Sequence, residues 1–389
     1  MQKPLGTRLH GGNMRALTLQ ETAAAMGGRV YGRIEIPNVK GVCIDSRDPD
    51  PKGPGSQGLF IAIRGERFDG HDYVESVLED WAAAAVVDDV NRIHKRFRST
   101  GRLIEVDDTV QALGRLATWY RRRFSAQVIA VLGSNGKTTT KDLIAAVLKS
   151  NKRGRAAKAS FNNAIGVPLT LLSVEPSDEF VVVEIGGNRP GEIGELARIA
   201  QPDMAVVTSI AEEHLAGFGD LAGVAREEFS FLSAMRGPPD PLCGPFVAIN
   251  EQAVPLAPQG LLRNTTLLTY GLDRRADLRA EDLEQTAEEQ RFRVNGRFEY
   301  RLPLMGRHNV LNALAAVAIG TRFRLGHEAI ADALRDAEPL PMRLQPIKYG
   351  SVTLINDAYN SNPASCRAAF DALDQAPTIG RIGVVCVVD

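Results

Sequence analysis

Continuous apolar runs alternate with stretches of helical period along the middle of this chain of 389 residues. Apolar runs at 126–133, 180–186 and 204–210 predict strands, and the stretches after Lys137 and at 191–200 predict helices. Runs without polar alternation are typical of strands that are buried on both faces of a parallel sheet. Because strands and helices alternate, we expect right-handed βαβ units. The pattern therefore predicts an α/β fold with a central, doubly wound domain.

Shorter apolar segments lie on both sides of this central pattern. The run at 58–65 predicts a strand and a turn, and 73–87 predicts a helix that leads into a strand. We therefore expect a small N-terminal α/β domain at residues 14–98. The central domain is expected at 99–337. It includes a helix at 110–124, strand-like segments at 246–250, 266–271, 292–296 and 298–304, and a helix at 309–323.

A Pro-rich segment at 338–346 resembles a hinge, because proline rarely continues a helix or a central strand. Beyond it, the pattern predicts a strand at 352–357, a helix at 363–373 and a strand at 381–389. Two strands and one helix rarely bury enough surface to be stable alone. We therefore expect residues 338–389 to be an incomplete C-terminal domain.

Composition excludes several classes of protein. The net charge is -1, and the basic clusters at 121–123 and 152–155 are short, so a nucleic-acid-binding surface is not indicated. The four cysteines are widely separated, which argues against a zinc site or a disulfide framework and favours a reducing cytoplasm. No stretch approaches the roughly 18 apolar residues that would span a bilayer.

The clearest chemical motif is VLGSNGKTTTKDLI at 131–144, which combines an apolar strand, a Gly-rich turn and the start of a helix. Backbone N–H groups, a helix N-terminus and an ammonium group together favour bound phosphate. Lys137 is expected to reach the β and γ phosphates of a nucleotide, and the hydroxyl of Thr138 is expected to bind magnesium. The alternative is a Gly-rich turn that only joins strand to helix. The loop is shorter than the ordinary phosphate loop, because Gly133 precedes Gly136 by only three positions.

Further candidates lie where later strands end, the usual ligand edge of an open α/β sheet. Glu184 ends an apolar strand and is interpreted as a metal ligand, the alternative being a carboxylate turned outward. His214 follows another strand and could bind the same metal or the substrate, or be an ordinary loop histidine. The segment 357–362 places Asp357 and three other hydrogen-bonding residues at a strand-to-helix turn, where Asn362 could simply cap the helix. The sequence before Asn309 could likewise be only an N-cap.

Taken together, these motifs resemble those of the Mur ligase family, whose signature is the shortened loop GSNGKTT. The other matching segments are DSR, LFIAIRGERFDGHDY, FNNAIGVPLTLL, VVVEIGGNRPGEI, EEHLAGFGDLAGVA, LMGRHNVLNALAA and INDAYNSNP. The resemblance implies an ATP-dependent, ADP-forming ligase of peptidoglycan precursor synthesis, and hence a role in cell wall biogenesis, cell shape, the cell cycle and cell division. It is greatest to the members that add D-alanyl-D-alanine. No Asp-Asn-Pro-Arg segment, which the diaminopimelate- or lysine-adding relatives use, is present.

The resemblance also assigns residues. Lys137, Glu184 and His214 would be catalytic, and magnesium would be bound by Thr138, Glu184, His214 and Glu228. Ser46, Arg47 and Asn163 would contact the substrate, the first two at its uridine end. ATP would be bound by Gly133, Ser134, Asn135, Gly136, Lys137, Thr138, Thr139, His308, Asn309, Asn312, Arg343 and Asp357.

The implied cofactors are ATP and Mg²⁺, and the implied partners are UDP-N-acetylmuramoyl-tripeptide and D-alanyl-D-alanine. In the implied reaction, the terminal carboxylate of the precursor attacks the γ-phosphate, and the amine of the dipeptide attacks the resulting acyl phosphate. The protein mainly positions and neutralises charged groups in such a reaction. We expect a cytoplasmic monomer that binds neither nucleic acid nor membrane.

One departure from the family concerns Glu228. At this place the family usually carries a lysine that is carbamylated by carbon dioxide and binds a second magnesium ion, whereas this chain has no lysine between Lys158 and Lys348. Glu228 is expected to supply the missing carboxylate; the alternative is that Glu227 and Glu228 form a solvated helix face. Two other functions stay open: a degenerate nucleotide-binding homologue without ligase activity, and a ligase for another substrate such as folate, against which the DSR segment argues.

Overall fold

The computed structural model describes residues 14–32, 38–47, 57–237, 245–258, 265–286, 289–350, 352–375 and 383–385. These residues form two compact units. The first contains the described residues up to Val128 together with Arg153–Ile185 and Glu195–Pro202. The second contains Ile129–Lys152, Gly186–Gly194 and the described residues from Asp203 onward.

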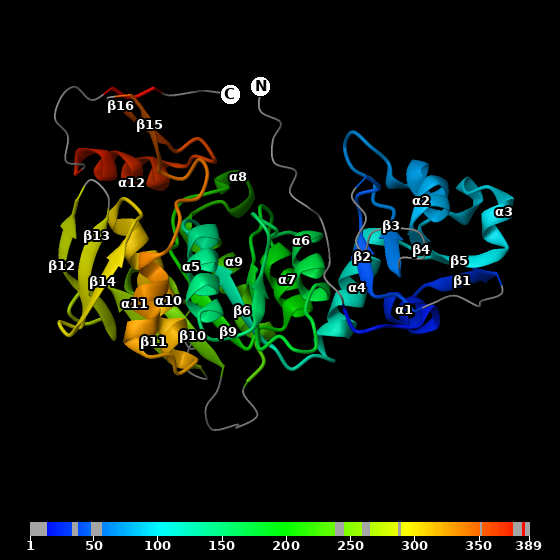
Figure 1. The fold of residues 1–389 in the computed structure, drawn as a ribbon, viewed down its shortest axis with the longest axis horizontal. Helices are drawn as coiled ribbons and strands as arrows, with labels where there is room; N and C mark the ends of the chain where they lie inside the picture. Colours follow the sequence, from blue (N-terminus) through cyan, green and yellow to red (C-terminus); the bar gives the residue numbers. More distant parts are fainter. Residues whose placement is uncertain are drawn as a thin grey trace. The chain divides into compact units, whose positions relative to one another are not determined.

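The first unit contains a five-stranded sheet in the order β1-β5-β4-β3-β2 (Figure 1). Its strands are β1 (Arg29–Gly32), β2 (Gly41–Cys43), β3 (Gly58–Ile61), β4 (Ala82–Val87) and β5 (Thr100–Glu105). Strands β2 to β5 are parallel, whereas β1 is antiparallel to β5. Every residue of β2, β3 and β4 is buried, as expected for apolar strands within a parallel sheet. The carboxyl ends of β2, β3 and β4 therefore share one edge.

Helices and two further strands complete the first unit. They are α1 (Leu19–Met26), η1 (Gly70–Tyr73), α2 (Val74–Asp80), η2 (Val90–Arg92), α3 (Lys95–Arg98), α4 (Thr109–Arg121), β7 (Gly154–Ala156), α6 (Gly166–Leu172), β8 (Phe180–Glu184) and the C-terminal turns of α7 (Glu192–Ala200). Helix α4 packs against α1 and α6. The buried hydroxyl of Tyr120 donates to the carbonyl of Val174 at 2.7 Å, and Arg121 Nε donates to the carbonyl of Ala200 at 2.9 Å. These contacts satisfy polar groups that burial would otherwise penalise.

The second unit is built on the strand order β14-β13-β12-β11-β10-β9-β6. The strands are β6 (Gln127–Leu132), β9 (Met204–Val207), β10 (Phe246–Asn250), β11 (Thr266–Gly271), β12 (Leu278–Gln285), β13 (Gln290–Val294) and β14 (Phe298–Leu302). Strands β6, β9, β10 and β11 are parallel, β12 starts parallel to β11, and β12 to β14 form an antiparallel meander. The meander differs from a purely doubly wound sheet, and the sequence pattern had not indicated β12.

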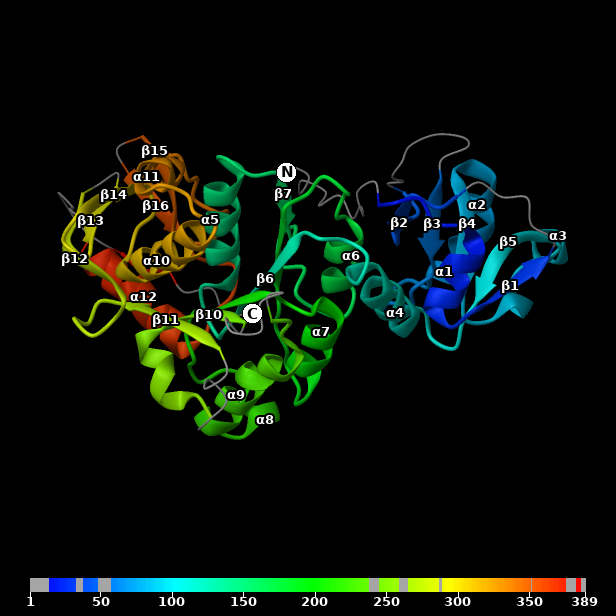
Figure 2. The same cartoon turned by 90° about the horizontal axis from the view of Figure 1, so that it is seen from below.

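The helices of the second unit are α5 (Lys137–Lys149), α8 (Leu215–Phe218), α9 (Leu221–Glu228), η3 (Phe229–Ala234), η4 (Glu251–Leu256), α10 (Arg307–Arg322), α11 (His327–Arg335) and α12 (Pro363–Asp374). Helix α10 is buried along most of its length, and it packs beside α5 and against β10 and β11 (Figures 1 and 2). Its run of small apolar residues allows this close packing on several neighbours at once.

Strands β15 (Gln345–Tyr349) and β16 (Val352–Asn356) pair as an antiparallel hairpin ahead of α12. The sequence pattern had indicated β16 and α12 but not β15. The strand expected at 381–389 lies largely outside the described residues. The α/β class is confirmed, whereas the domain limits 14–98, 99–337 and 338–389 stay predictions. Within the described residues, no helix has the length and apolar character needed to cross a membrane.

Candidate active site

The predicted phosphate loop, Gly133–Thr139, joins β6 to α5 and is tied to the segment that follows β9. The N–H of Ser134 donates to the carbonyl of Ser209 at 2.7 Å, and the N–H of Asn135 to the Ser209 hydroxyl at 3.1 Å. The hydroxyl of Thr208 donates to the carbonyl of Asn135 at 2.6 Å. The hydroxyl of Ser134 in turn accepts from the N–H of Ala211 at 2.9 Å. Because β6 and β9 are adjacent and parallel, the loop lies at the carboxyl edge of the sheet, where ligands usually bind.

Two glycines give the loop its shape. Gly133 has φ 113° and Gly136 has φ 82°, a region that residues with a side chain rarely adopt. A Cβ atom on Gly133 would lie 2.5 Å from Thr208 Oγ1, and one on Gly136 would lie 2.5 Å from Asn312 Oδ1. Gly136 is also the N-cap of α5, so no side chain of its own covers the first N–H groups of that helix. The loop can therefore present backbone N–H groups and a helix N-terminus to an anion.

We expect Gly136→Ala to weaken both folding and nucleotide binding. An added methyl group would suffer left-handed strain of about 1–2 kcal/mol and, in addition, a clash with Asn312 costing on the order of 1–3 kcal/mol. Gly219→Ala is the matched control, because Gly219 has the same φ of 82° but nothing within 4 Å of the new Cβ. Urea unfolding and titration with an ATP analogue measure the two effects. Equal behaviour of the two variants would show that the Asn312 contact does not shape the loop.

Lys137 and Thr138, the first residues of α5, both have partners within the protein. The ammonium of Lys137 donates to the carbonyls of Gly133 and Ser134. The hydroxyl of Thr138 is buried and accepts from Arg343 Nη2 at 3.0 Å. Thr139, the next residue, is half-buried. The ammonium thus lies directly on the predicted phosphate loop, from which its flexible stem can turn toward a ligand.

The segment after the predicted hinge also reaches the loop. The guanidinium of Arg343 lies 4.0 Å from the centre of the Tyr359 ring, and Asn362 Nδ2 donates to Asn135 Oδ1 at 2.8 Å. Asp357 accepts from the N–H of Leu344 at 3.0 Å; burial raises the pKa of Asp357, and this hydrogen bond and Arg343 oppose the rise. Asn362 is also the N-cap of α12, so the predicted capping of this helix by Asn362 is confirmed as one of its roles. The structure therefore brings Arg343 and Asn362 to the loop.

Glu227 and Glu228 at the end of α9 are both buried, so the alternative of a solvated helix face is wrong. Glu228 Oε2 accepts from the N–H of Gly133 at 2.8 Å. Burial raises the pKa of Glu228 to about 7, although nearby Lys137 opposes the rise. Glu227 instead accepts from the N–H groups of Gly191 at 2.8 Å and Ile193 at 2.9 Å, at the start of α7. Neighbouring positions on a helix point about 100° apart, and only Glu228 contacts the loop.

The first two turns of α10 carry the residues expected to contact adenine, His308, Asn309 and Asn312. Asn309 Nδ2 donates to the carbonyl of Met305 at 2.7 Å, and Asn312 Nδ2 donates to Asn309 Oδ1 at 3.0 Å. Asn312 Oδ1 also accepts from the hydroxyl of Thr140 at 3.1 Å, which links α10 to α5 beside Gly136. Burial lowers the pKa of His308 to about 4, so its imidazole is neutral near pH 7. A neutral imidazole and two amides suit recognition of a polar, uncharged ring.

Glu184 ends β8 in the first unit and is almost fully buried. Its Oε1 accepts from Asn162 Nδ2 at 2.9 Å, whereas Oε2 is buried without a hydrogen-bond partner among the described residues. The alternative of an outward-facing carboxylate is therefore wrong. Asn163 makes local hydrogen bonds: its Oδ1 accepts from the N–H groups of Ile165 and Gly166 at 3.1 and 2.9 Å. Asn162, which we had not singled out, is the residue that orients Glu184.

His214 is the N-cap of α8 with φ 48°, and its exposed ring lies edge-on to Phe218. Ser46 and Arg47 follow β2 at the carboxyl edge of the first unit's sheet. Arg47 is paired with Asp45 at 2.9 Å but is 85% exposed, so its guanidinium remains accessible. The structure thus places Ser46 and Arg47 together, and it places His214 at the carboxyl edge of β9 in the second unit.

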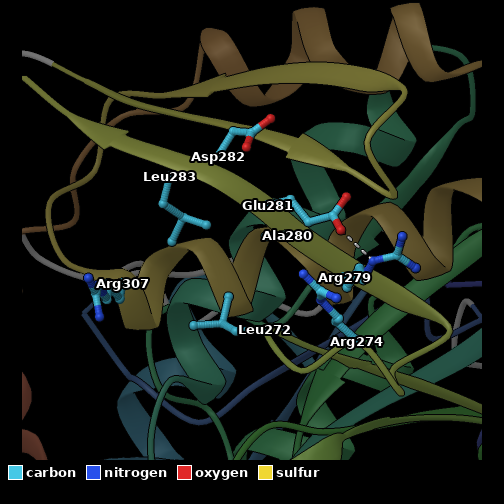
Figure 3. A pocket seen from close by; sticks show the side chains of 8 residues that line it. All are labelled: Leu272, Arg274, Arg279, Ala280, Glu281, Asp282, Leu283 and Arg307. Atoms are coloured by element: carbon cyan, nitrogen blue, oxygen red, sulfur yellow. Dashed lines mark hydrogen bonds and ion pairs between the residues drawn. The ribbon is translucent and has the colours of Figure 1, made fainter.

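A pocket of about 560 Å³ lies between β12 and the start of α10 (Figure 3). Figure 3 shows Arg279 paired with Glu281 on one side and Arg307, the first residue of α10, on the other. Leu272, which follows β11, forms part of its apolar wall. The lining of the pocket includes Arg307, the residue before His308 in the chain, but none of the predicted site residues.

The predicted magnesium ligands do not include a set of three close His, Cys, Asp or Glu side chains within the described residues. Magnesium does not require one, since it usually keeps several waters and binds one or two carboxylates together with substrate phosphates. The buried Oε2 of Glu184, which has no hydrogen-bond partner among the residues that the structure describes, is the observation that fits a cation, because an isolated buried carboxylate oxygen is costly.

Comparison with known proteins decides the family. Residues 131–320 match the Mur ligase middle domain, and residues 38–121 match the Mur ligase family catalytic domain. The UDP-N-acetylmuramoyl-tripeptide--D-alanyl-D-alanine ligase of Bacillus subtilis (strain 168) is 35% identical over 93% of this chain and 77% of its own length. The chain belongs to the Mur ligase family. The ligase of the same description from Escherichia coli (strain K12) is 31% identical over 94% of this chain and 78% of its own length.

Solved Mur ligase structures agree in fold. A crystal structure of MurF from Acinetobacter baumannii matches with a TM-score of 0.81 and 28% identity, over 93% of this chain and 77% of that one. The match supports the α/β architecture of the Mur ligase fold. Residues that we missed, chiefly Asn162, Thr208 and Ser209, act through contacts between segments far apart in sequence. The sequence signal for Thr208 and Ser209 is their position as polar residues directly after the apolar strand β9.

Proposed function

We propose that this protein joins D-alanyl-D-alanine to UDP-N-acetylmuramoyl-tripeptide with ATP, in the cytoplasm and as a monomer. The identity of 35% to a ligase of that description over most of both chains supports the reaction. The observation that carries the proposal is the predicted phosphate loop, with two glycines in positive φ, the Lys137 ammonium and an uncovered helix N-terminus. Such an arrangement binds the phosphates of a nucleotide.

The residues of the second unit would divide the work on ATP. Backbone N–H groups of the loop and Lys137 would bind the phosphates, and Arg343, which already contacts Thr138, would lie beside them. His308, Asn309 and Asn312 would contact the base. The close approach of Asn312 to Gly136 would keep these base-binding residues at a fixed distance from the phosphate-binding loop. Preorganised donors of this kind stabilise charge that develops during phosphoryl transfer.

Magnesium would be bound by Thr138 and by carboxylates or imidazole among Glu184, His214 and Glu228. A bound magnesium ion would neutralise phosphate charge during transfer. The carboxylate of the tripeptide would attack the γ-phosphorus, forming an acyl phosphate and releasing ADP. The amine of the dipeptide would then attack the acyl carbon and release phosphate. Asn163 would contact the tripeptide, and Ser46 and Arg47 the uridine end.

The test is a phosphate-release assay with ATP, magnesium and both substrates, in which each component is omitted in turn. We expect release to require both the UDP-tripeptide and the dipeptide, with a product heavier than the UDP-tripeptide by one dipeptide less water. Addition of a chelator should stop the reaction, and added magnesium should restore it. Phosphate release that needs neither substrate would identify a simple ATPase and contradict the proposal.

A further inference from the structure

The pocket between β12 and the start of α10 holds positive charge that its own carboxylates do not fully neutralise (Figure 3). Its lining includes Arg274, Arg279 and Arg307, together with Glu281 and Asp282. Arg279 Nε lies 2.7 Å from Glu281 Oε1, so these two side chains neutralise each other. Arg274 and Arg307 have neither a hydrogen bond nor an ion pair with any residue that the structure describes. Two guanidinium groups of the pocket are therefore available to an anion.

The two available guanidinium groups belong to separate segments. Arg274 lies in the connection between β11 and β12, whereas Arg307 is the first residue of α10. A single exposed arginine is ordinary on a protein surface. A positive charge in the first turn of a helix is unfavourable, however, because the helix dipole is positive there. Like charges around one cavity also repel each other, so a bound anion would relieve both effects.

Strand β12 is distorted where it lines the pocket. Its register against β13 shifts between Glu281 and Glu284, and Asp282 has φ 53°, a left-handed conformation that residues with a side chain rarely adopt. Asp282 Oδ2 lies 3.7 Å from Arg293 Nη1 on β13, and the next residue, Leu283, lines the pocket. Bulges of this kind are frequent next to functional sites, where they redirect a side chain. The backbone outlier of β12 therefore coincides with the pocket, as expected for a ligand site.

Apolar side chains lie between the two available guanidinium groups. Figure 3 shows Leu272 and Leu283 between Arg307 on one side of the pocket and Arg274 on the other. The volume of about 560 Å³ is within the range of small-molecule sites and far exceeds the roughly 30 Å³ that one water molecule occupies in the liquid. An inorganic ion would leave most of this space unfilled. The lining therefore suits an organic molecule with an anionic group at each end and an apolar middle.

We propose that this pocket binds a small organic dianion, whose two anionic groups contact Arg274 and Arg307 and whose apolar body lies on Leu272 and Leu283. A guanidinium group binds either a carboxylate or a phosphate through paired hydrogen bonds, so both kinds of anionic group fit. None of the residues predicted to bind ATP, magnesium or the substrates lines the pocket. The site is therefore separate from the proposed ligation reaction and does not depend on it.

Terephthalate, a flat ring with a carboxylate at each end, is the probe, and ligand-observed NMR titration measures its affinity. Benzoate, which has one carboxylate, should bind about tenfold more weakly, and uncharged benzyl alcohol should not bind. Arg274→Gln and Arg307→Gln should each weaken terephthalate binding about tenfold, because each removes one guanidinium group. Arg275→Gln is the matched control and should bind like the wild type: Arg275 is 91% exposed and paired with Asp273, and it does not line the pocket. All three variants should melt at the wild-type temperature, since these arginines are exposed.

Hydroquinone diphosphate, titrated in the same way, compares phosphate with carboxylate, and the tighter of the two probes carries the anionic group that the pocket prefers. An ATP analogue with magnesium should displace neither probe, because no predicted nucleotide-binding residue lines the pocket. Displacement would assign the pocket to ATP and overturn the proposal. Failure of the wild type to bind either dianion, or an equal loss of affinity in Arg275→Gln, overturns it as well.

Discussion

Replacing Lys137 with alanine is expected to lower turnover by at least about a hundredfold while leaving the fold intact. The removal of one preorganised donor to a developing charge typically costs two to three orders of magnitude in rate. The contribution of Lys137 to folding should be small, because the hydrogen bonds that its ammonium donates in the described part of the chain go to the carbonyls of Gly133 and Ser134, outside the apolar core. Initial rates with saturating substrates and the melting temperature together measure the two effects.

Lys149→Ala is the control for Lys137→Ala, since Lys149 is exposed at the other end of the same helix. The change removes the same side chain from α5 and should leave both rate and melting temperature close to those of the wild type. A Lys137→Ala enzyme with near-normal turnover would remove the predicted phosphate loop from the mechanism. A large fall in melting temperature would instead show that Lys137 stabilises the loop itself.

The loop could be predicted because its requirements are local. Strand β6, Gly133, Gly136 and Lys137 are consecutive or nearly so, and the hydrophobic pattern alone places them at a strand-to-helix turn. The partners of the loop could not be predicted in the same way. Thr208 and Glu228 contact it only because β9 and α9 fold back onto it, 73 and 95 residues away along the chain. Contacts between segments so far apart cannot be predicted from the spacing of residues along the chain.

A second limit on prediction from the sequence arises where two adjacent residues are of the same type. In the segment FNNAIG, the predicted substrate role belongs to Asn163, whose Oδ1 accepts from the N–H groups of Ile165 and Gly166, whereas Asn162 is the one that donates to Glu184. Two adjacent asparagines offer the same chemistry, and only the backbone direction decides which of them faces the carboxylate. Strand β15 was missed for a different reason: it begins with Gln345 and Pro346, which do not alternate as a typical strand does.

Glu228 gives the second large expected effect. The resemblance places a carbamylated lysine at this position, and Glu228 would present the same anion on a shorter stem without requiring carbon dioxide. Its Oε2 accepts from the Gly133 N–H, and the positive charge of nearby Lys137 acts to lower its pKa. The carboxylate therefore lies at the predicted phosphate loop. A water bridging it to magnesium could make up the missing reach, since magnesium releases its waters reluctantly.

Glu228→Gln should reduce turnover by about tenfold to a hundredfold and weaken the apparent affinity for magnesium, because the amide keeps the shape but removes the charge. The variant should remain folded, since an amide oxygen can still accept from Gly133. Burial raises the pKa of Glu228 to about 7 in the metal-free protein. Because this pKa lies above that of an ordinary glutamate, the contribution of Glu228 to the free energy of unfolding is fully present below the ordinary glutamate pKa and is lost as the pH rises through 7. The glutamine variant should therefore be at least as stable as the parent at pH 8.

Glu227→Gln is the matched control, one position away on the same helix. Glu227 accepts from Gly191 and Ile193 at the start of α7, so removing its charge should lower stability by about 1 kcal/mol without changing the dependence on magnesium. Both variants and the parent are assayed with and without bicarbonate. The parent should not respond to bicarbonate, because no lysine is available for carbamylation between Lys158 and Lys348. A strong rise in activity with bicarbonate, or a Glu228→Gln enzyme as active as the parent, would show that Glu228 does not replace the carbamate.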